Sequence, residues 1–372
     1  MVRLEWVPAR CGRGITTHPT SSRYRRLPLT KDTMRRVSVI ILAYGDEPLL
    51  AACLEAVLAS RDVDLELLLV DNGSPAVLDV AADDRLRVIT PDENTGFAGG
   101  CNLGARNARH DTFVFVNSDL IVRPDAIATL TSRLDDDRVG LVTGAVLMPG
   151  EPFVVNSIGN PIHYLMFSWA GAYGEPFANH PSREPVAGIS GAFFACRRTQ
   201  WELLDGFDEQ FFAYAEDADL SLRTWQSGKA VDFEPLAVGV HHYSFTKSNH
   251  KWFLLERNRL IALFTLYDRR SIWSLLPVMI PVEMGVLVAA VKGGWAREKV
   301  ASWRWIWTHR AYLRERRHRV ARVRAVASVD WTVVLEAEMH IPSEFGLSVP
   351  ASVNWILGRY WNVVRPFITS RS

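Results

Sequence analysis

The first third of the chain alternates short apolar runs with segments of helical period. Residues 37–42 (VSVIIL) form a β-branched apolar run of the kind that a buried parallel strand needs. Residues 48–60 (PLLAACLEAVLAS) predict a helix with a proline in its first turn. Further strands are predicted over 65–75, 86–91 and 112–120, and a second helix over 97–108. Alternation at this spacing predicts an α/β fold with a doubly wound, mostly parallel sheet.

Short polar side chains follow three of these predicted strands. They are Asp46 and Glu47, then Asp71 and Asn72, then Asn117 and Asp119. Ligands of doubly wound sheets bind outside the carboxyl ends of the strands, so these side chains are expected to converge on one site. Turn chemistry alone explains any one of the three pairs, but it explains all three together less well.

The pattern loosens beyond the fourth predicted strand. Residues 148–185 are rich in glycine, proline and aromatic residues and have no clear period, which predicts loops over a substrate cleft. Residues 188–210 predict a strand, a helix and a glycine turn. Residues 230–244 predict a last pair of strands, which ends in His241 and His242.

The C-terminal region, residues 267–372, is predicted to be helical, apolar at first and then basic. Residues 271–291 hold one charge, Glu283, and are long enough to span a bilayer. Pro277 and Pro281 weaken that interpretation, and the Trp- and Arg-rich segment that follows is typical of a membrane interface. We expect a helical pair that lies on the membrane or re-enters it, ahead of a true span, with a buried core helix as a third alternative.

The net charge and its distribution along the chain indicate which kinds of partner it could bind. The chain of 372 residues carries 42 Lys and Arg against 41 Asp and Glu, so it has no overall basic character that would indicate nucleic acid. The charge is uneven, however, because residues 1–36 are basic and residues 292–324 contain eleven Lys or Arg with only Glu298 and Glu315 as acids. A local excess of this kind attracts an anionic membrane surface or a phosphate-bearing partner.

The cysteines and the N-terminus indicate a cytoplasmic protein. Four cysteines lie far apart, which is typical of reduced thiols and not of a disulfide framework or a zinc site. Residues 1–36 lack the apolar core of a signal peptide. They are predicted to form a disordered basic extension, and Met34 is an alternative translation start.

Two motifs contain candidate metal-binding or catalytic residues. The chain has no GxxxxGK[ST] loop, and GFAGG (residues 96–100) lacks the GxGxxG spacing, so a bound nucleotide would be held by carboxylates and a metal ion. Asp119 in VNSDL supplies a hard oxygen ligand at a strand end, where Asn117 adds a neutral oxygen or orients the ligand. The same letters also form ordinary Asx turns.

The second motif is the acidic stretch FFAYAEDADLSLR, residues 211–223. On a helix Glu216 and Asp219 share a face, while Asp217 points elsewhere. An acid among like charges and aromatic walls should have a raised pKa, which suits a general base. The alternative is a helix start that attracts acids to its dipole.

Histidine and arginine side chains add candidates for anion or metal binding. His241 and His242 end a predicted strand, so at most one is expected to face the site as a metal or phosphate ligand. Arg257 and Arg259 either hold phosphate or are surface charges.

Seven ordered motifs resemble the family-2 inverting glycosyltransferases, and within them the bacterial rhamnosyltransferase-like branch. The motifs are VSVIILAYGDEPLLAACLEAVLAS, LLLVDNGSP, ENTGFAGGCNLGARNA, FVNSDLIV, SGAFFACRR, GFDEQFFAYAEDADLSLR and VHHYS. The resemblance covers residues 37–266 and implies a GT-A type domain. Its nucleotide-sugar-binding half would be 37–145 and its acceptor and catalytic half 146–266.

The resemblance also implies the residues of the donor site. Asp71 would contact the base and the Asp46–Glu47 region the nucleoside, although the family's Asn-Glu pair is replaced here by Asp46-Glu47. Asp119, in a variant of the DxD motif, and His241 would hold Mg²⁺ or Mn²⁺. The remaining nucleotide contacts would be Ala43, Tyr44, Asn72, Asn94, Asn102, Asn117 and Ser118.

On the acceptor side, the resemblance makes Asp217 the base, supported by Glu216. Gly191, Phe212, Tyr214 and Asp219 would line the acceptor side. The implied reaction moves a sugar, with dTDP-rhamnose as the candidate donor, to a hydroxyl of a glycan or a polyprenyl-linked acceptor in cell-envelope polysaccharide synthesis. The enzyme would then work in the cytoplasm at the inner face of the membrane.

Two other classes of protein compete with the transferase interpretation. A nucleotidyltransferase would need a Gly- and Arg-rich phosphate loop after the first strand, and AYGDEPLL is not one. A non-catalytic module that binds a nucleotide sugar or a lipid-linked glycan would keep the sheet, but it would not need Asp119, Asp217 and His241 together.

Overall fold

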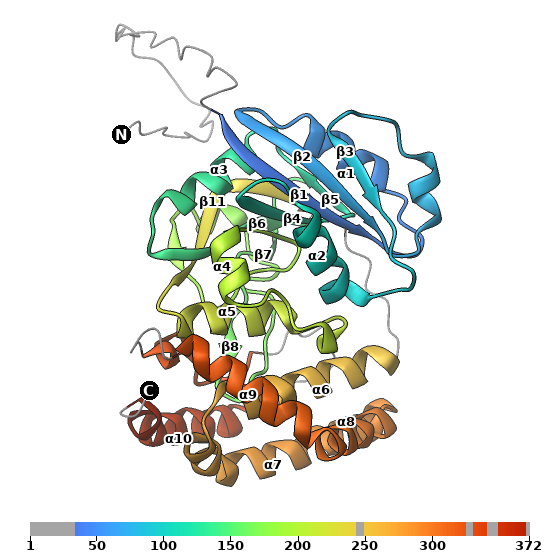
Figure 1. Cartoon of the computed structure of the whole chain (residues 1–372). Coiled ribbons are helices and arrows are strands. Elements are labelled where there is room, and N and C mark those ends of the chain that lie inside the picture. The colour runs from blue at the N-terminus through green and yellow to red at the C-terminus, as the bar shows by residue number, and fades with distance from the viewer. Residues whose placement is uncertain (1–33, 243–248, 325–329, 341–348, 370–372) are drawn as a thin grey trace, which may run out of the picture.

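The computed structural model describes residues 34–242, 249–324, 330–340 and 349–369 (Figure 1). The expected basic extension lies outside the described residues up to residue 33. An α/β domain forms one half of the molecule, and a layer of helices from the C-terminal third lies beneath it (Figure 1).

A 10-stranded sheet, mostly parallel at one end, forms the centre of the α/β domain. Its main path runs in the order β3-β2-β1-β4-β10-β6-β11-β5, with β7 beside β6 and β9 beside β11. The strands are β1 (Arg35–Ala43), β2 (Val63–Asp71), β3 (Leu86–Ile89), β4 (Thr112–Asn117), β5 (Leu120–Val122), β6 (Val139–Leu147), β7 (Val155–Ser157), β9 (Glu184–Pro185), β10 (Phe193–Arg197) and β11 (Ala230–His241).

Helices cover both faces of this sheet, which explains why its central strands are apolar on both sides. In β1 the side chains of Val39 and Ile41 enter one core with α1 (Leu50–Leu58) and α3 (Ala126–Ser132). Ile40 points to the opposite core, which contains residues of α2 (Gly96–Asn107), α4 (Arg198–Leu203) and α5 (Glu216–Gln226). The α/β class and the first four predicted strands are confirmed.

The region after β6 differs from the prediction in one respect. Residues 230–241 form a single long strand, β11, and not a pair of strands. Its pairing with β6 shifts register between Glu234 and Val238. Pro235 lies in this irregularity, where its missing N–H costs no ladder hydrogen bond.

The C-terminal helices form a second layer with its own core. They are α6 (Asn249–Leu266), α7 (Arg269–Gly293), α8 (Ala296–Thr308), α9 (Arg310–Arg324) and α10 (Ala351–Thr369). Strand β12 (Leu335–Glu336) pairs in parallel with β8 (Ile162–His163), and Tyr164 stacks on Trp361 with ring centres 4.6 Å apart. These contacts fasten the end of the chain to the loops of the α/β domain.

Residues 271–291 belong to one continuous helix, α7, instead of the expected helical pair. Among the described residues, α7 is long and apolar enough to cross a membrane by length and composition. Of its apolar window, 28% is buried inside the protein. Its central acid, Glu283, is buried and forms ion pairs with Arg259 of α6 and Lys299 of α8. One side of α7 is therefore packed into the helical layer, and the other is exposed.

Short 3₁₀ turns complete the described chain. They are η2 (Pro75–Asp79), η3 (Arg133–Asp135), η4 (Phe177–Asn179), η5 (Glu209–Phe211) and η6 (Trp331–Val334). Of these, η5 directly precedes the loop that leads into α5.

Candidate active site

The carboxyl ends of β1, β2 and β4 meet at one edge of the sheet. In the parallel register Ala43 lies opposite Asp71, and Leu42 lies opposite Asn117. Asp71 and Asn117 therefore end two strands that flank β1. The convergence predicted from the sequence is confirmed for these positions.

The loop after β1 is tied to the turn after β2. One oxygen of Asp71 accepts hydrogen bonds from the backbone N–H groups of Gly73 and Ser74, at 3.1 and 3.0 Å. The Ser74 hydroxyl donates to the carbonyl of Gly45 at 2.7 Å. Tyr44 is left exposed beside this junction, so its ring forms part of the open rim of the site.

Three of the asparagines that were expected to contact a nucleotide are bonded to the protein. Asn72 is buried, donates to the side-chain oxygen of Asn94 at 2.7 Å, and accepts from the N–H of Thr95 at 2.9 Å, which builds the turn before α2. Asn102 donates to the carbonyl of Phe207 at 2.8 Å and accepts from its N–H at 3.0 Å. Asn102 thus holds the turn after α4, and this corrects its expected role as a nucleotide contact.

Asp119, in the turn between β4 and β5, and His241, the last residue of β11, meet at the same edge. Their Oδ1 and Nε2 atoms are 2.9 Å apart, because β5, which follows Asp119, pairs with the end of β11 so that Leu120 lies opposite His241. The Oδ1 atom of Asn156 lies 3.3 Å from Nδ1 of His241 and orients the ring. His242 is exposed.

A carboxylate and an imidazole in this arrangement fit a divalent cation whose other ligands are phosphate oxygens and water. Among the residues that the structure describes, no group of three or more His, Cys, Asp or Glu side chains is arranged to hold a metal ion. A cation between Asp119 and His241 would therefore need oxygens of its ligand to complete its coordination.

Glu47 and Ser118 lie beside the Asp119–His241 pair. Burial raises the pKa of Glu47; a hydrogen bond from Ser118 opposes this rise, and the charges of Asp119 and Asp46 add to it. Asp46 itself is exposed. This edge of the sheet thus concentrates carboxyl groups, which favours a bound cation.

The loop before α5 has an unusual backbone. Phe212, Tyr214 and Ala215 all have positive φ angles, between 62° and 72°, a region that residues other than glycine seldom adopt. The side-chain amide of Asn258 in α6 donates to the carbonyls of Phe211, Ala213 and Tyr214 at 2.7–2.9 Å. These bonds from the C-terminal layer hold the strained loop in place.

Asp217 lies in the first turn of α5 and faces the loops over the sheet. Its Oδ2 atom accepts from the side chain of Asn160 at 3.1 Å and from the N–H of Gly191 at 3.3 Å. Its Oδ1 atom accepts from the N–H of Ala218 at 2.8 Å. Burial raises the pKa of Asp217, although these hydrogen bonds oppose the rise. A partly exposed carboxylate with a raised pKa suits proton abstraction.

Glu216 is buried more deeply than Asp217. Its Oε2 atom has no hydrogen-bond partner in the described structure. Burial, with the charges of Asp217 and Asp219, raises the pKa of Glu216 to about 8. The raised pKa favours the neutral form of Glu216, which limits the negative charge next to Asp217.

Glu216 gives a prediction about stability and pH. Its carboxyl holds a proton up to about pH 8 when folded but only up to about its ordinary value of 4.5 when unfolded. The free energy of unfolding should fall as pH rises between these values, because the unfolded chain binds fewer protons. Urea unfolding at pH 5 and pH 8 should show a smaller fall for Glu216→Gln than for wild type; an identical fall would contradict the assignment.

Asp219 does not face the acceptor side, which corrects that expectation. It is 1% exposed, and its carboxylate binds Arg223 at 2.8 Å and Arg316 of α9 at 2.5 Å. Arg316 also binds Asp208 at 2.7 Å. This acid, which was expected on the acceptor side, instead joins α5 to the C-terminal layer.

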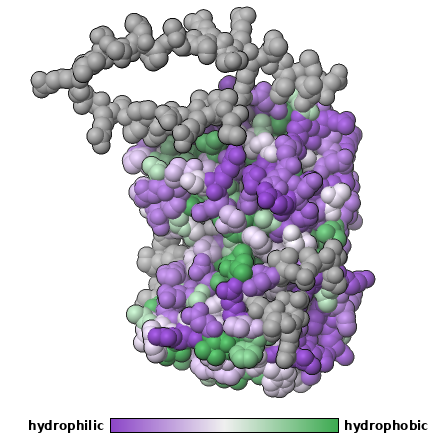
Figure 2. Space-filling view, turned by 90° about the vertical axis from the view of Figure 1, so that its left-hand side faces the viewer, coloured by the Kyte–Doolittle hydropathy of each residue, from purple (hydrophilic) through white to green (hydrophobic). Residues whose placement is uncertain are grey.

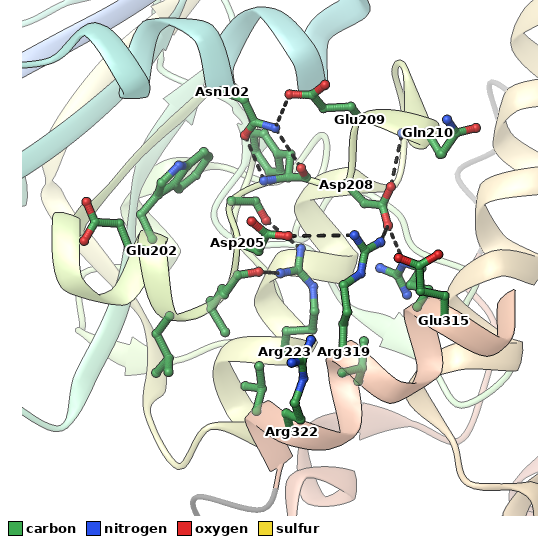
Figure 3. Close-up of a pocket in the computed structure, with 18 of the residues that line it drawn as sticks. Asn102, Glu202, Asp205, Asp208, Glu209, Gln210, Arg223, Glu315, Arg319 and Arg322 are labelled. Carbon is green, nitrogen blue, oxygen red and sulfur yellow. Dashed lines mark hydrogen bonds and ion pairs between the residues drawn. The ribbon is translucent and has the colours of Figure 1, made fainter. Parts of the chain in front are cut away.

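This ionic network borders a polar cavity of about 900 Å³ between residues 201–210 and α9 (Figure 3). Asp208 forms ion pairs with Arg316 and Arg319. Arg223 points into the same space from α5 (Figure 3). Acids and bases line the cavity together and largely pair with each other. We therefore assign it a structural role, as the junction of the two layers.

Arg257 and Arg259 are neither phosphate ligands nor surface charges. Arg257 is buried and donates to the carbonyls of Gln210 and Phe211 at 2.7 and 2.9 Å. Arg259 is also buried, and its guanidinium group forms an ion pair with the carboxylate of Glu256 at 2.8 Å. Both arginines serve the contact between α6 and its surroundings.

Of the other expected acceptor-side residues, Gly191 contacts Asp217 directly. A side chain at Gly191 would meet Asp217 at 3.6 Å, so the glycine leaves room in front of the carboxylate. Phe212 packs on the start of α2, where a Cβ at Gly96 would come within 2.4 Å of its carbonyl. Tyr214 is 37% exposed, and Lys251 lies 5.1 Å above its ring.

Sequence reasoning missed several residues that position these groups. Asn160 lies in a loop without a period, and Asn258 and Arg316 belong to helices more than 40 residues away from Asp217. Nothing in their local sequence indicates that they reach the site. The single available signal was the density of arginine in α9.

The fold and this site define a class of protein. The arrangement resembles the solved structure of GalNAc-T7 with UDP, GalNAc and Mn²⁺, with a TM-score of 0.53, 15% identity, and coverage of 66% of this chain and 51% of that chain. The fold is thus of GT-A type. Residues 38–201 match the family model "Glycosyl transferase family 2". The protein therefore carries a family 2 glycosyltransferase domain.

Curated relatives agree with this assignment. The N-acetylglucosaminyl-diphospho-decaprenol L-rhamnosyltransferase of Mycobacterium tuberculosis is 26% identical over 64% of this chain and 87% of its own length. The O-antigen biosynthesis protein RfbC of Myxococcus xanthus is 29% identical over 62% of this chain. That match spans only 19% of the length of RfbC.

Proposed function

We propose that this protein is a metal-dependent, inverting glycosyltransferase that moves a sugar from a nucleoside diphosphate to a hydroxyl of a lipid-linked glycan in cell-envelope polysaccharide synthesis. The observation that carries the proposal is the placement of two groups at one site. Asp217 accepts a hydrogen bond from the N–H of Gly191, and the carbonyl of the next residue, Ala192, accepts one from the N–H of Asn117 at 3.0 Å. Asn117 ends β4 two residues before Asp119, which pairs with His241, and these contacts support one site that holds both the carboxylate with a raised pKa and the carboxylate–imidazole pair. These are the groups that a single displacement requires.

In this mechanism Asp217 accepts the proton of the acceptor hydroxyl. Asn160 and the N–H of Gly191 fix the carboxylate, and its raised pKa makes it a better base at neutral pH. The deprotonated oxygen attacks the anomeric carbon from the face opposite the nucleotide, which inverts the configuration. No group of the chain needs to form a covalent intermediate.

On the donor side, Asp119 and His241 would hold Mg²⁺ or Mn²⁺ against the diphosphate. A bound cation would neutralise the charge that develops on the departing diphosphate. The turn at Asp71 and the rim at Tyr44 would hold the nucleoside, with Ala43, Asp46, Glu47, Asn117 and Ser118 around it. The name of one relative, an L-rhamnosyltransferase, supports rhamnose as the sugar, and dTDP-rhamnose is the first donor that we propose to test.

The outer face of the helical layer supports an acceptor at a membrane. Apolar side chains on α7 are exposed by 51–72% in one stripe: Trp273, Ile280, Met284, Val288 and Val291. Trp355, Val363 and Phe367 of α10 are exposed in the same layer, and apolar surface gathers at the lower end of the molecule (Figure 2). We propose that this face rests on the inner leaflet, where a polyprenyl-linked acceptor would be anchored.

Donor binding can be tested by thermal shift. Nucleotide sugars, beginning with dTDP-rhamnose, are added with Mn²⁺ or Mg²⁺ to wild type and to Asp119→Ala. A ligand at a hundredfold excess over Kd stabilises the folded state by about 2.7 kcal/mol. We expect one nucleotide sugar to raise the Tm of wild type only in the presence of metal, and not to raise that of Asp119→Ala.

Asp125→Ala is the matched control, because Asp125 is an exposed acid nearby whose side chain caps no helix. It should show the wild-type shift. If no nucleotide sugar shifts wild type, the proposed donor site is wrong; if Asp119→Ala shifts like wild type, the metal role of Asp119 is wrong.

A further inference from the structure

A second cavity, separate from the sheet edge, lies within the helical layer. It is a groove of about 760 Å³ between α6, α7, α8 and α9. Its apolar lining includes Phe264, Met279, Ile280, Met284, Trp303 and Ile306. Ile280 and Met284 belong to the exposed stripe of α7, so the groove opens on the face that we propose to rest on the membrane.

One side of the groove carries a row of arginines. Arg310, Arg314 and Arg317 are spaced by four and three residues on α9, which places them on one face of the helix. Like charges at this spacing destabilise a helix. Their guanidinium groups donate hydrogen bonds to the carbonyl oxygens of residues 307, 310 and 264. Within the described chain, none of the three guanidinium groups forms an ion pair with a carboxylate.

A neighbouring arginine of α9 is buried and paired with carboxylates, unlike the three arginines of this row. Arg316, the residue directly before Arg317 on α9, is 2% exposed and pairs with two aspartates. Burial and the nearby charge of Arg269 lower the pKa of Arg317, and the charge of Asp268 opposes this fall. The groove side of α9 thus holds three guanidinium groups without a carboxylate partner in the described chain. The wall beside them is largely apolar, and the acid in it, Glu283, is already paired with Arg259 and Lys299.

We propose that this groove binds the prenyl diphosphate part of a lipid-linked acceptor. The first isoprene units would lie against Phe264, Met279 and Trp303, and the diphosphate would bind the guanidinium groups of Arg310, Arg314 and Arg317. Guanidinium groups bind phosphate oxygens through two parallel hydrogen bonds. This inference rests on the proposed function for the identity of the lipid.

The groove is connected to the catalytic loop through α9. Leu313 lines the groove and also packs against Phe211 and Ile261. Arg316, on the adjoining face, binds Asp219 in the helix that carries Asp217. A lipid held along α9 therefore lies beside the element that positions the base, and its glycan can extend towards the site.

Direct labelling tests the proposal without requiring turnover. The full-length protein in neutral detergent is irradiated with a benzophenone-capped geranyl diphosphate, and the labelled peptides are mapped by mass spectrometry. We expect labels in α7–α9, and competition by farnesyl diphosphate but not by farnesol or inorganic pyrophosphate. Arg314→Gln/Arg317→Gln should reduce labelling about tenfold, as expected when two charge-assisted contacts are lost.

The matched control removes the same charge elsewhere. Arg297→Gln/Arg304→Gln lies on exposed positions of α8 outside the groove lining and should label like wild type. Equal losses in both double variants would show general attraction to anions, and labels confined to the exposed faces of α7 and α10 would show simple membrane contact. Either result overturns the groove assignment.

The donor experiment separates this inference from the proposed function. Arg314→Gln/Arg317→Gln should keep the metal-dependent thermal shift with the nucleotide sugar. Labelling lost together with an intact donor shift supports the groove. A donor shift in wild type without groove labelling would leave the transferase assignment standing and reject the lipid site.

Discussion

Replacing Asp217 by asparagine is expected to lower kcat by about a hundredfold or more, because asparagine cannot accept the proton of the acceptor hydroxyl. The substitution preserves size, and an asparagine oxygen can still accept the hydrogen bonds from Asn160 and Gly191. Binding of the donor should therefore be retained. The measurement is single-turnover transfer of labelled sugar, together with the donor-induced shift of Tm.

Asp205→Asn is the control for this experiment. Asp205 is an exposed acid whose side chain is 84% accessible and whose one ion pair, with Arg319, is 3.9 Å long. The same chemical change there should leave kcat within about twofold of wild type. If Asp217→Asn kept full activity, Asp217 would not be the base. If wild type bound the donor but transferred nothing to any acceptor, a non-catalytic binding module would be favoured.

Replacing Arg316 by methionine is expected to lower the free energy of unfolding by about 3–5 kcal/mol, the usual effect of removing one partner from a buried ion pair. Arg316 is 2% exposed and binds both Asp208 and Asp219. Methionine fills much of the space but leaves Asp219, which is 1% exposed, with one of its two cationic partners. Urea unfolding at pH 7 measures the loss.

Arg319→Met tests whether burial is the cause. Arg319 is on the same helix and also reaches Asp208, but its side chain is 39% exposed, so its removal should cost less than about 1 kcal/mol. Adding Asp219→Asn to Arg316→Met should recover part of the stability, because it removes the carboxylate that lost its partner. Equal effects of the two single arginine substitutions would contradict the buried network.

The pH dependence of this network follows from Asp208. Burial opposes its ionisation, but the charge of Arg316 and hydrogen bonds from Tyr312 and Arg316 prevail, so the pKa of Asp208 is lowered. A lowered pKa contributes stability that is complete above the ordinary value for aspartate and is lost as pH falls through the folded value. The difference between wild type and Arg316→Met should therefore narrow in acid.

These contacts indicate that the C-terminal region does more than attach the protein to a membrane. Its apolar and basic composition alone indicates a membrane attachment, yet Asn258 and Arg316 reach the loop and the helix that carry Asp217. We infer that the helical layer positions the base as well as offering a surface to the membrane. Removal of residues beyond 248 would then be expected to disturb the catalytic loop.

Much of the donor side could be predicted from the sequence. Buried parallel strands require continuous β-branched runs, and residues 37–42 have that composition. Parallel strands bring their carboxyl ends to one edge, so Asp71 and Asn117 could be placed together before the structure was known. The pairing of Asp119 with His241, by contrast, needs the register of β5 against β11.

The three acids of residues 216–219 show where sequence reasoning ends. Helical spacing separates Asp217 from the other two, but it does not say what each meets. Asp219 pairs with Arg316 from a helix 97 residues further along the chain, and Glu216 lies buried without a partner for one oxygen. The burial and the partners of these acids depend on which distant helix packs against α5.

The α/β sheet, the strand ends that carry polar groups and the uneven charge could all be predicted from the sequence, because each depends on local periodicity and composition. Only the tertiary structure decided that Asp219 is structural, that Asn102 holds a turn, that α7 is one half-packed helix, and that three arginines of α9 border an apolar groove. Those properties depend on contacts between residues far apart in the chain, and local sequence carries no record of such contacts.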